Sequence, residues 1–399
     1  MLKYFFTRLF FAILTLLIIV AVVYISVAQF SENYYQNQIT AQTVSGGANN
    51  GVKYAQTYEY YLKSVKEHLT YKIEGVDSYD TFLASDQKDT WADLKVNPLI
   101  RFGYWVQSVF NTSQPFGTPF DSRILSTSSG AKTIPEYFFL NLRFSIIITL
   151  PSFIISVILG ITLGIVAAYK RGTFIDSSIN AFALLFVALP SFVIAPIFIS
   201  LQVKLNITST FINPWSETEL EVNSIADIIA SWIPPILIIV LGSLSGYITF
   251  VRNQIITVLT SNYVLIAKSK GLGTVEIFFK YVLRNISIPL ASALIPSYIG
   301  LLTGGIIIET YWQVPGISRV IQNSFPNGEI NLIMFNTAFF TALSLLTVII
   351  VDISYVFLDP RIKYGSRSPK SLSTQFKAYL YRKKMFEKLT YVDSTNTNN

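Results

Sequence analysis

Long apolar stretches dominate the pattern of hydrophobic and polar positions along this chain. Windows with almost no charge recur at about 9–29, 144–169, 177–201, 229–251, 288–310 and 333–358. A helix needs about 20 consecutive apolar residues to cross the hydrocarbon core of a bilayer. The pattern therefore predicts an all-α integral membrane protein with six transmembrane helices.

The polar segments between these windows divide the chain into four parts. Residues 1–30 hold a short stub and the first span, 31–139 form a long polar insert, 140–358 hold the other five spans, and 359–399 form a basic tail. The first apolar window is longer than the core of a signal peptide, about 7–15 residues, so we expect a retained helix. The insert is large enough for a small ordered domain, and the tail is expected to contain a helix that contacts the membrane surface or a partner.

Composition and charge agree with a membrane protein and give it an orientation. Of 399 residues, 51% are hydrophobic and only 13% are charged, against about 25% charged in a typical soluble domain. If the N-terminus is cytoplasmic, the segments 1–8, 170–176, 252–287 and 359–399 lie inside and hold about 18 of the 30 Lys and Arg. This asymmetry obeys the positive-inside rule. It predicts a multi-pass cell-membrane protein with both termini cytoplasmic, and it assigns the net charge of +7 to topology rather than to nucleic-acid binding.

The residue types needed for most enzyme sites are scarce. The chain has no Cys and one His, His68, which excludes disulfides, thiolate metal sites and clusters of His ligands. The spans contain no paired Asp, no Ser–His combination and no H-E-x-x-H. The phosphate-binding pattern G-x-x-x-x-G-K-S/T is absent as well. We therefore expect no catalytic residues, no metal site and no cofactor in this chain.

One basic, glycine-broken segment lies between two apolar windows, within about 252–287. It contains "YVLIAKSKGLGTVEIFFKYVLRNISIPL" at 263–290. The spacing predicts two short helices joined by a turn at Gly271, with an apolar face over 275–283 and a charged face from Glu276 to Arg284. Periodicity leaves two interpretations open. The segment is either a plain basic loop with interfacial helices or a knob that a soluble partner binds.

This segment resembles the cytoplasmic coupling loop of ABC-importer permeases in its oligopeptide/dipeptide form. The matching residues are Tyr263, Val264, Ala267, Lys270, Gly271, Leu272, Leu283, Arg284, Asn285 and Pro289. The Glu that opens the general motif is replaced by Leu265, a departure that is common in the peptide branch. Further stretches resemble the family in the right order: "ALPSFVIAPIFI" at 188–199, "ETYWQVPGISRVI" at 309–321, where Ser318 replaces a Gly, and "DISYVFLDPRIKYG" at 352–365. The resemblance covers about 1–30 and 100–365.

The resemblance implies a B-type permease subunit with the type I ABC importer fold and an extracytoplasmic insert between its first two helices. Such a subunit translocates oligopeptides or dipeptides that an external substrate-binding protein delivers. Its partners would be a second, C-type permease and two ATPase subunits, which bind ATP and Mg. One alternative is nickel or another small solute as the substrate. A more distant alternative is an ion-coupled secondary transporter, although that class requires ionisable residues in mid-span positions.

The resemblance selects residues for coupling, and prolines within spans and charges near span ends select residues for a gate or pathway. The residues implied in coupling to the ATPase are Tyr263, Ala267, Lys270, Gly271 and Leu272. The candidates for a gate or pathway are Pro190, Glu309, Arg319 and Asp352. For these the residue patterns leave structural alternatives open, because Pro190 could be a packing kink, Glu309 could be an interfacial cap rather than a partner of Arg319, and Asp352 could pair structurally near Arg361. The insert is expected to help seat the substrate-binding protein.

Overall fold

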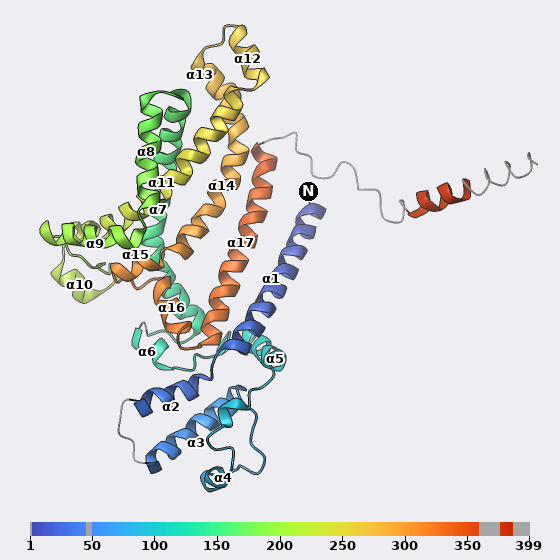
Figure 1. The fold of residues 1–399 in the computed structure, drawn as a ribbon, viewed down its shortest axis with the longest axis vertical. Coiled ribbons are helices and arrows are strands. Elements are labelled where there is room, and N and C mark those ends of the chain that lie inside the picture. The colour runs from blue at the N-terminus through green and yellow to red at the C-terminus, as the bar shows by residue number, and fades with distance from the viewer. Residues whose placement is uncertain (1, 45–49, 129, 359–375, 386–399) are drawn as a thin grey trace, which may run out of the picture.

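Long helices form a bundle in the computed structural model, which describes residues 2–44, 50–128, 130–358 and 376–385. Five helices in this part of the chain are long and apolar enough to cross a membrane, and they run side by side in Figure 1. They are α1 (Leu2–Phe30), α7 (Ile134–Tyr169), α11 (Ile225–Leu259), α14 (Leu283–Gly304) and α17 (Ile330–Leu358). They coincide with five of the six predicted windows.

The sixth window, predicted as one crossing at 177–201, is bent instead of straight. Here α8 (Phe174–Ala188) and α9 (Ser191–Lys204) meet at 95°, and α9 runs across the bundle rather than along it (Figure 1). Pro190 lies at the bend with extended backbone, ψ 142°. Proline has no backbone N–H and disfavours helical geometry at the residue before it, so the helix stops there. The predicted count of six spans holds when this pair is taken as one broken span.

The insert forms a helical subdomain beyond one end of the bundle (Figure 1). Its elements are α2 (Tyr34–Val44), α3 (Asn50–Lys66), α4 (Tyr79–Ala84), η1 (Trp91–Asp93), α5 (Pro98–Val109) and α6 (Arg123–Ser128). Aromatic side chains dominate its core, where Tyr61, Phe82 and Trp91 are buried together. We call this end of the molecule the insert end.

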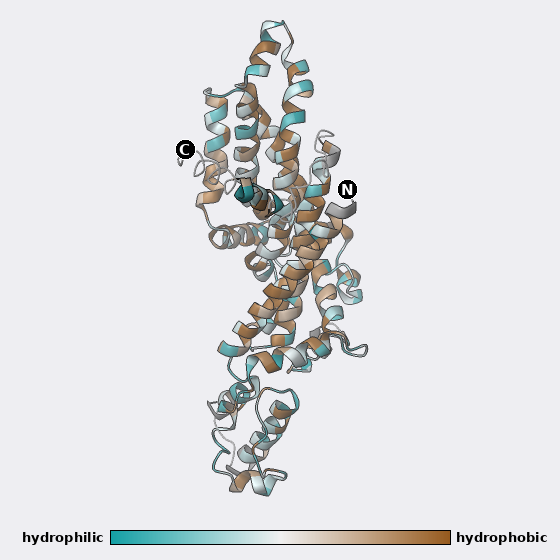
Figure 2. Ribbon diagram, turned by 90° about the vertical axis from the view of Figure 1, so that its right-hand side faces the viewer, coloured by the Kyte–Doolittle hydropathy of each residue, from teal (hydrophilic) through white to brown (hydrophobic). Residues whose placement is uncertain are grey.

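Short helices lie at the opposite end, which we call the loop end. There α12 (Asn262–Ser269) and α13 (Thr274–Ile277) follow α11, and the π-helical turn η2 (Phe278–Val282) leads into α14. Figure 2 shows hydrophobic residues concentrated along the long helices, with hydrophilic residues more frequent in the insert and near the loop end. Three remaining short helices lie toward the insert end: α10 (Glu217–Val222), α15 (Ile306–Tyr311) and α16 (Ile317–Ser324).

Helices α7 and α11 make the most extensive contact in the bundle. Their contact includes serine side chains, because Ser243 donates to the Ser156 hydroxyl at 2.7 Å. Such hydroxyl bonds between helices help to hold a bundle together where no water competes. The predicted tail helix is represented by residues 376–385, which are helical with exposed side chains. The remainder of 359–399 lies outside the described residues.

Candidate functional site

The loop end has the two short helices and the turn that the sequence predicts. Helix α12 ends at Ser269, and Gly271 adopts φ +79°. This left-handed conformation suits glycine because a Cβ would be strained there. Helix α13 begins at Thr274, and Lys280 pairs with Glu276 one turn earlier at 2.5 Å. The charged face between Glu276 and Lys280 is therefore as predicted.

The predicted apolar face over 275–283 is confirmed at Val282 and wrong at Val275 and Phe279. Val275 and Phe279 are 71% and 62% exposed, whereas Ile277 and Val282 are buried. The buried pair is spaced by five residues because η2 is a π-helical turn, which closes i→i+5 rather than i→i+4. This extra residue in the turn rotates the buried face away from the positions that a 3.6-residue period assigns to it.

The predicted coupling residues divide between the surface and the interior. Ala267 is only 2% exposed and packs with Val264 against α11, in a cluster that includes Val251, Ile255 and Val258. Tyr263, Lys270 and Gly271 are exposed, and Leu272 is half-buried. Ala267 thus fixes α12 on α11 and has no surface to offer to another subunit.

Four exposed apolar side chains at the loop end were missed by the sequence reasoning. We call them the tip residues, and they are Leu265, Ile266, Val275 and Phe279. Leu265 and Ile266 lie between the buried Val264 and Ala267, whose i, i+3 spacing defines the inner face of α12. That spacing was the available signal. Exposed apolar groups beyond the end of a bundle make this end a candidate surface for binding another protein or a membrane.

An ion pair joins α8 to α11 next to the loop end. Asp176, near the start of α8, accepts hydrogen bonds from Nε and Nη2 of Arg252 on α11, both at 2.7 Å. The same carboxylate accepts from the backbone N–H of Gly172 at 3.0 Å and from Asn180 at 2.7 Å. The pair joins the α7–α8 turn to α11. The sequence reasoning did not select Asp176 or Arg252, although they are opposite charges at the edges of apolar windows.

At the insert end, Glu309 is buried and acts as a cap. Its carboxylate accepts from the Ser145 hydroxyl at 2.5 Å and from the backbone N–H of Ser318 at 2.8 Å, and Ser145 in turn accepts from the N–H of Ile317 at 2.8 Å. The N–H donors of Ile317 and Ser318 belong to the first turn of α16, where N–H groups have no partner within the helix. A Cβ on Gly316 would lie 2.5 Å from the Ser145 oxygen, so only glycine fits at that position.

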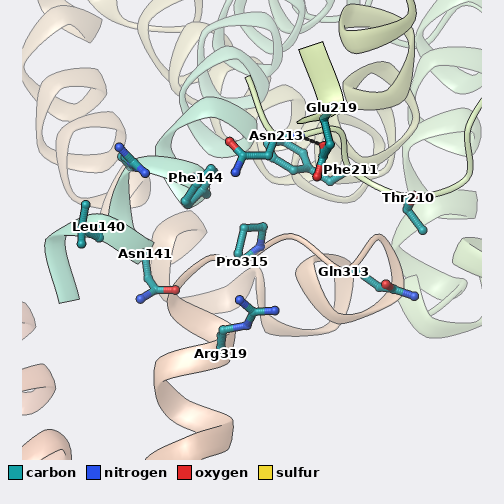
Figure 3. A pocket seen from close by; sticks show the side chains of 11 residues that line it. Leu140, Asn141, Phe144, Thr210, Phe211, Asn213, Glu219, Gln313, Pro315 and Arg319 are labelled. Atoms are coloured by element: carbon teal, nitrogen blue, oxygen red, sulfur yellow. Dashed lines mark hydrogen bonds between the residues drawn. The ribbon is translucent and has the colours of Figure 1, made fainter. Parts of the chain in front are cut away.

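Arg319 lies in a pocket instead of pairing with Glu309. Both carboxylate oxygens of Glu309 are used by Ser145 and Ser318, and no ion pair joins Glu309 to Arg319 in the described part of the chain. Of the two alternatives for Glu309, the cap is therefore formed and the pairing with Arg319 is not. The pocket has a volume of about 450 Å³ and is shown in Figure 3. Its lining residues are Leu140, Asn141, Arg143, Phe144, Thr210, Phe211, Asn213, Glu219, Gln313, Pro315 and Arg319.

Asp352 pairs with a residue that the sequence reasoning did not consider. Its carboxylate lies 3.2 Å from the guanidinium of Arg8. This ion pair joins the end of α17 to the start of α1, whereas the expected neighbour Arg361 lies outside the described residues. The contact places the first and last long helices side by side at the loop end. Pro190, the remaining candidate for a gate or pathway, lies at the bend between α8 and α9.

Glu329 fastens the insert to the bundle and makes this attachment sensitive to pH. Its fully buried carboxylate accepts from the backbone N–H groups of Phe120 and Asp121, both at 2.7 Å. Burial, helped by the charges of Asp121 and Glu67, outweighs these bonds and raises the pKa of Glu329 to about 7. The folded protein therefore holds this proton more tightly than the unfolded chain does.

We expect the free energy of unfolding to fall as pH rises from about 4.5 to about 7. The contribution of Glu329 is complete below pH 4.5 and declines by on the order of 3 kcal/mol across this range. Thermal unfolding of wild type, Glu329→Gln and the exposed control Glu74→Gln at several pH values measures this. Glu329→Gln should flatten the dependence, and Glu74→Gln should keep it. Equal pH slopes in all three proteins would show that Glu329 does not titrate in this range.

The sequence matches the family described as binding-protein-dependent transport system inner membrane component over residues 160–364. The matched region includes α12, α13, the Asp176–Arg252 pair and the Glu309 cap. It corresponds to about half of the chain.

Curated relatives extend the similarity beyond that region. The chain is 32% identical over 268 residues to the oligopeptide transport system permease protein OppB of Mycoplasma genitalium, which covers 67% of this chain and 65% of the relative. It is 31% identical over 301 residues to OppB of Mycoplasma pneumoniae, and the match covers 75% of this chain and 74% of the relative. It is 29% identical over 213 residues to the dipeptide transport system permease protein DppB of Bacillus subtilis, and the match covers 53% of this chain and 64% of the relative. The chain thus spans about two thirds to three quarters of these relatives.

Proposed function

The chain belongs to the family of binding-protein-dependent transport system inner membrane components, and from this premise we propose that it is a membrane-spanning subunit of an ATP-driven importer of oligopeptides or dipeptides. The names of the relatives, which are oligopeptide and dipeptide permeases, support peptides as the substrate class. The observation that carries the proposal is the loop end, where apolar tip residues are exposed on short helices at the end of the bundle. The chain itself is no enzyme, and ATP is hydrolysed by separate ATPase subunits.

The proposed complex contains four further proteins. They are a second permease of the C type, two ATPase subunits that bind ATP and Mg, and an external substrate-binding protein. The loop end faces the cytoplasm and the insert end faces outward, as the distribution of Lys and Arg supports. The Arg8–Asp352 contact supports placing both termini on one side of the membrane, because it joins the start of α1 to the end of α17.

Two structural connections lead from the tip residues into the bundle of this chain. Ala267 and Val264 press α12 against α11, and Asp176 ties α11 to the α7–α8 turn. The turn η2 connects α13 directly to α14, which leads to α15 and the Glu309 cap. Closure of the ATPase subunits would push on the tip residues and bias the bundle between two packings, one open outward and one open inward.

Uptake by cells tests the proposed substrate class. A strain lacking this chain should lose uptake of labelled peptides, and uptake should return when the chain is restored. Competition by unlabelled peptides of graded length then defines the preferred length. If nickel or another small solute competes and peptides do not, the peptide assignment is wrong and the alternative within the family holds. If uptake follows an ion gradient and needs no ATP, the chain acts as a secondary transporter.

The insert offers a second surface on the outer side, and we propose that it helps seat the substrate-binding protein. Its aromatic core and its attachment through Glu329 give it a defined position on the bundle. A variant lacking about 36–95 should need a higher concentration of binding protein for the same uptake rate. Unchanged dependence on the binding protein would contradict this role.

A further inference from the structure

The pocket at the insert end holds two arginines that the proposed transport cycle does not use. Arg143 comes from α7 and Arg319 from α16, and both line the same space of about 450 Å³. Figure 3 labels Arg319 among the lining side chains. Within the described part of the chain neither guanidinium forms an ion pair. Two arginines without carboxylate partners in one concave site are the arrangement that proteins use to bind carboxylate or phosphate groups.

Arg143 is held in place without being neutralised. Its guanidinium carbon lies 4.4 Å from the ring centre of Trp215 and 4.8 Å from that of Phe144. These cation–π contacts fix the orientation of the group and leave its hydrogen-bond donors available. Its Nε is buried and has no hydrogen-bond partner. A buried donor without a partner is costly, so this guanidinium has hydrogen-bonding capacity that the protein itself does not use.

The other lining groups suit a peptide better than a simple anion. Glu219 brings a negative charge into the pocket. Within the described part of the chain, its carboxylate accepts one hydrogen bond, from the backbone N–H of Asn213. Asn141, Asn213 and Gln313 carry amides, which both donate and accept hydrogen bonds as peptide groups do. The volume lies within the range of about 300–1,000 Å³ that is usual for small-molecule sites.

We propose that this pocket binds a short peptide by its free C-terminal carboxylate, with Arg143 and Arg319 as the carboxylate ligands and Glu219 available to the amino group. This inference rests on the proposed function for the nature of the ligand. It adds a binding site on the permease itself, in which the charged ends of a peptide are recognised. A peptide whose carboxylate is blocked as an amide loses the group that the two arginines bind.

Direct binding tests the site without any transport. The purified chain in lipid nanodiscs is titrated with trialanine and with trialanine amide, and the fluorescence of Trp215 reports occupancy because its ring contacts Arg143. A Trp215→Phe variant identifies the signal from that residue. We expect trialanine to bind at least tenfold more tightly than its amide. Equal affinities, or no saturable signal with trialanine, would overturn the site.

Variants separate carboxylate recognition from folding. Arg319→Gln should reduce the preference for trialanine over its amide at least tenfold, and Arg143→Met should do the same. Arg143 packs between two rings, so replacing it can disturb the fold. Arg319 is exposed, so replacing it tests carboxylate binding with less effect on folding. Lys132→Gln removes an exposed positive charge near the start of α7 and should change nothing. If Arg319→Gln weakens the acid and the amide equally, or changes neither, the arginines do not bind the carboxylate.

Uptake by the assembled transporter distinguishes this site from the proposed function. The same binding protein is used throughout, so its own preference cancels when the acid-to-amide uptake ratio of each variant is divided by that of wild type. We expect Arg319→Gln to lower that relative ratio. An unchanged ratio with normal uptake would refute only the site. Carboxylate binding without ATP-driven uptake would refute only the proposed function. Equal losses for both peptides would instead indicate that the arginines dock an acidic surface of the binding protein.

Discussion

Replacing Ile266 by glutamate is expected to reduce ATP-driven peptide uptake at least tenfold while leaving the chain folded. Ile266 is 55% exposed on α12, so the charge remains in water until another subunit covers the tip. Once covered, a carboxylate without a partner costs several kcal/mol, comparable to the loss of a strong interface contact. Uptake by the assembled complex and co-purification of the ATPase subunits measure the effect. Both should fall together.

Two controls show whether the effect belongs to the tip. Val222→Glu places the same charge at an exposed apolar position on α10, toward the insert end, and should leave ATPase association unchanged. Ala267→Glu places it in the interior of the loop end and should lower stability and yield as well as uptake. If Ile266→Glu transports as well as wild type, the tip residues do not form the contact with the ATPase.

Replacing Asp176 by asparagine is expected to destabilise the chain by about 3–5 kcal/mol. The side chains of Asp176 and Arg252 are only 7% and 22% exposed, so the change leaves a largely buried guanidinium without its counter-charge. Adding Arg252→Met removes that charge and should restore part of the stability. Thermal unfolding in nanodiscs measures both variants.

The exposed ion pair of the insert provides the comparison. Asp77 and Lys72 are 79% and 59% exposed, and pairs of this kind contribute about 0–1 kcal/mol. Asp77→Asn should therefore leave the unfolding temperature almost unchanged. An Asp176→Asn variant as stable as Asp77→Asn would mean that the pair between α8 and α11 does not hold the loop end.

The long helices could be predicted because their spacing and length follow from a single requirement. A span must present about 20 apolar residues to lipid, and these residues are consecutive in the sequence. The turn at Gly271 was predictable for a similar reason, since a glycine between two periodic segments is a local signal. The match of five windows to α1, α7, α11, α14 and α17 reflects this local character.

The features that were missed depend on irregular geometry or on distant partners. A fixed period of 3.6 residues cannot reveal the extra residue in η2, so the exposure of Val275 and Phe279 was misjudged. In the sequence, Pro190 indicates a kink, but hydropathy does not give an angle of 95°. Glu309 finds its partner Ser145 164 residues away. Charge and burial can mark such a residue as important, and only the fold identifies its partner.

Peptide accumulation in proteoliposomes tests the central claim most directly. The chain is reconstituted with the second permease, the two ATPase subunits and the substrate-binding protein, and the concentration of labelled peptide across the membrane is followed with and without ATP. We predict accumulation above the starting concentration only when ATP, the binding protein and this chain are all present. Accumulation that persists without ATP, or in vesicles from which this chain is omitted, would contradict the account.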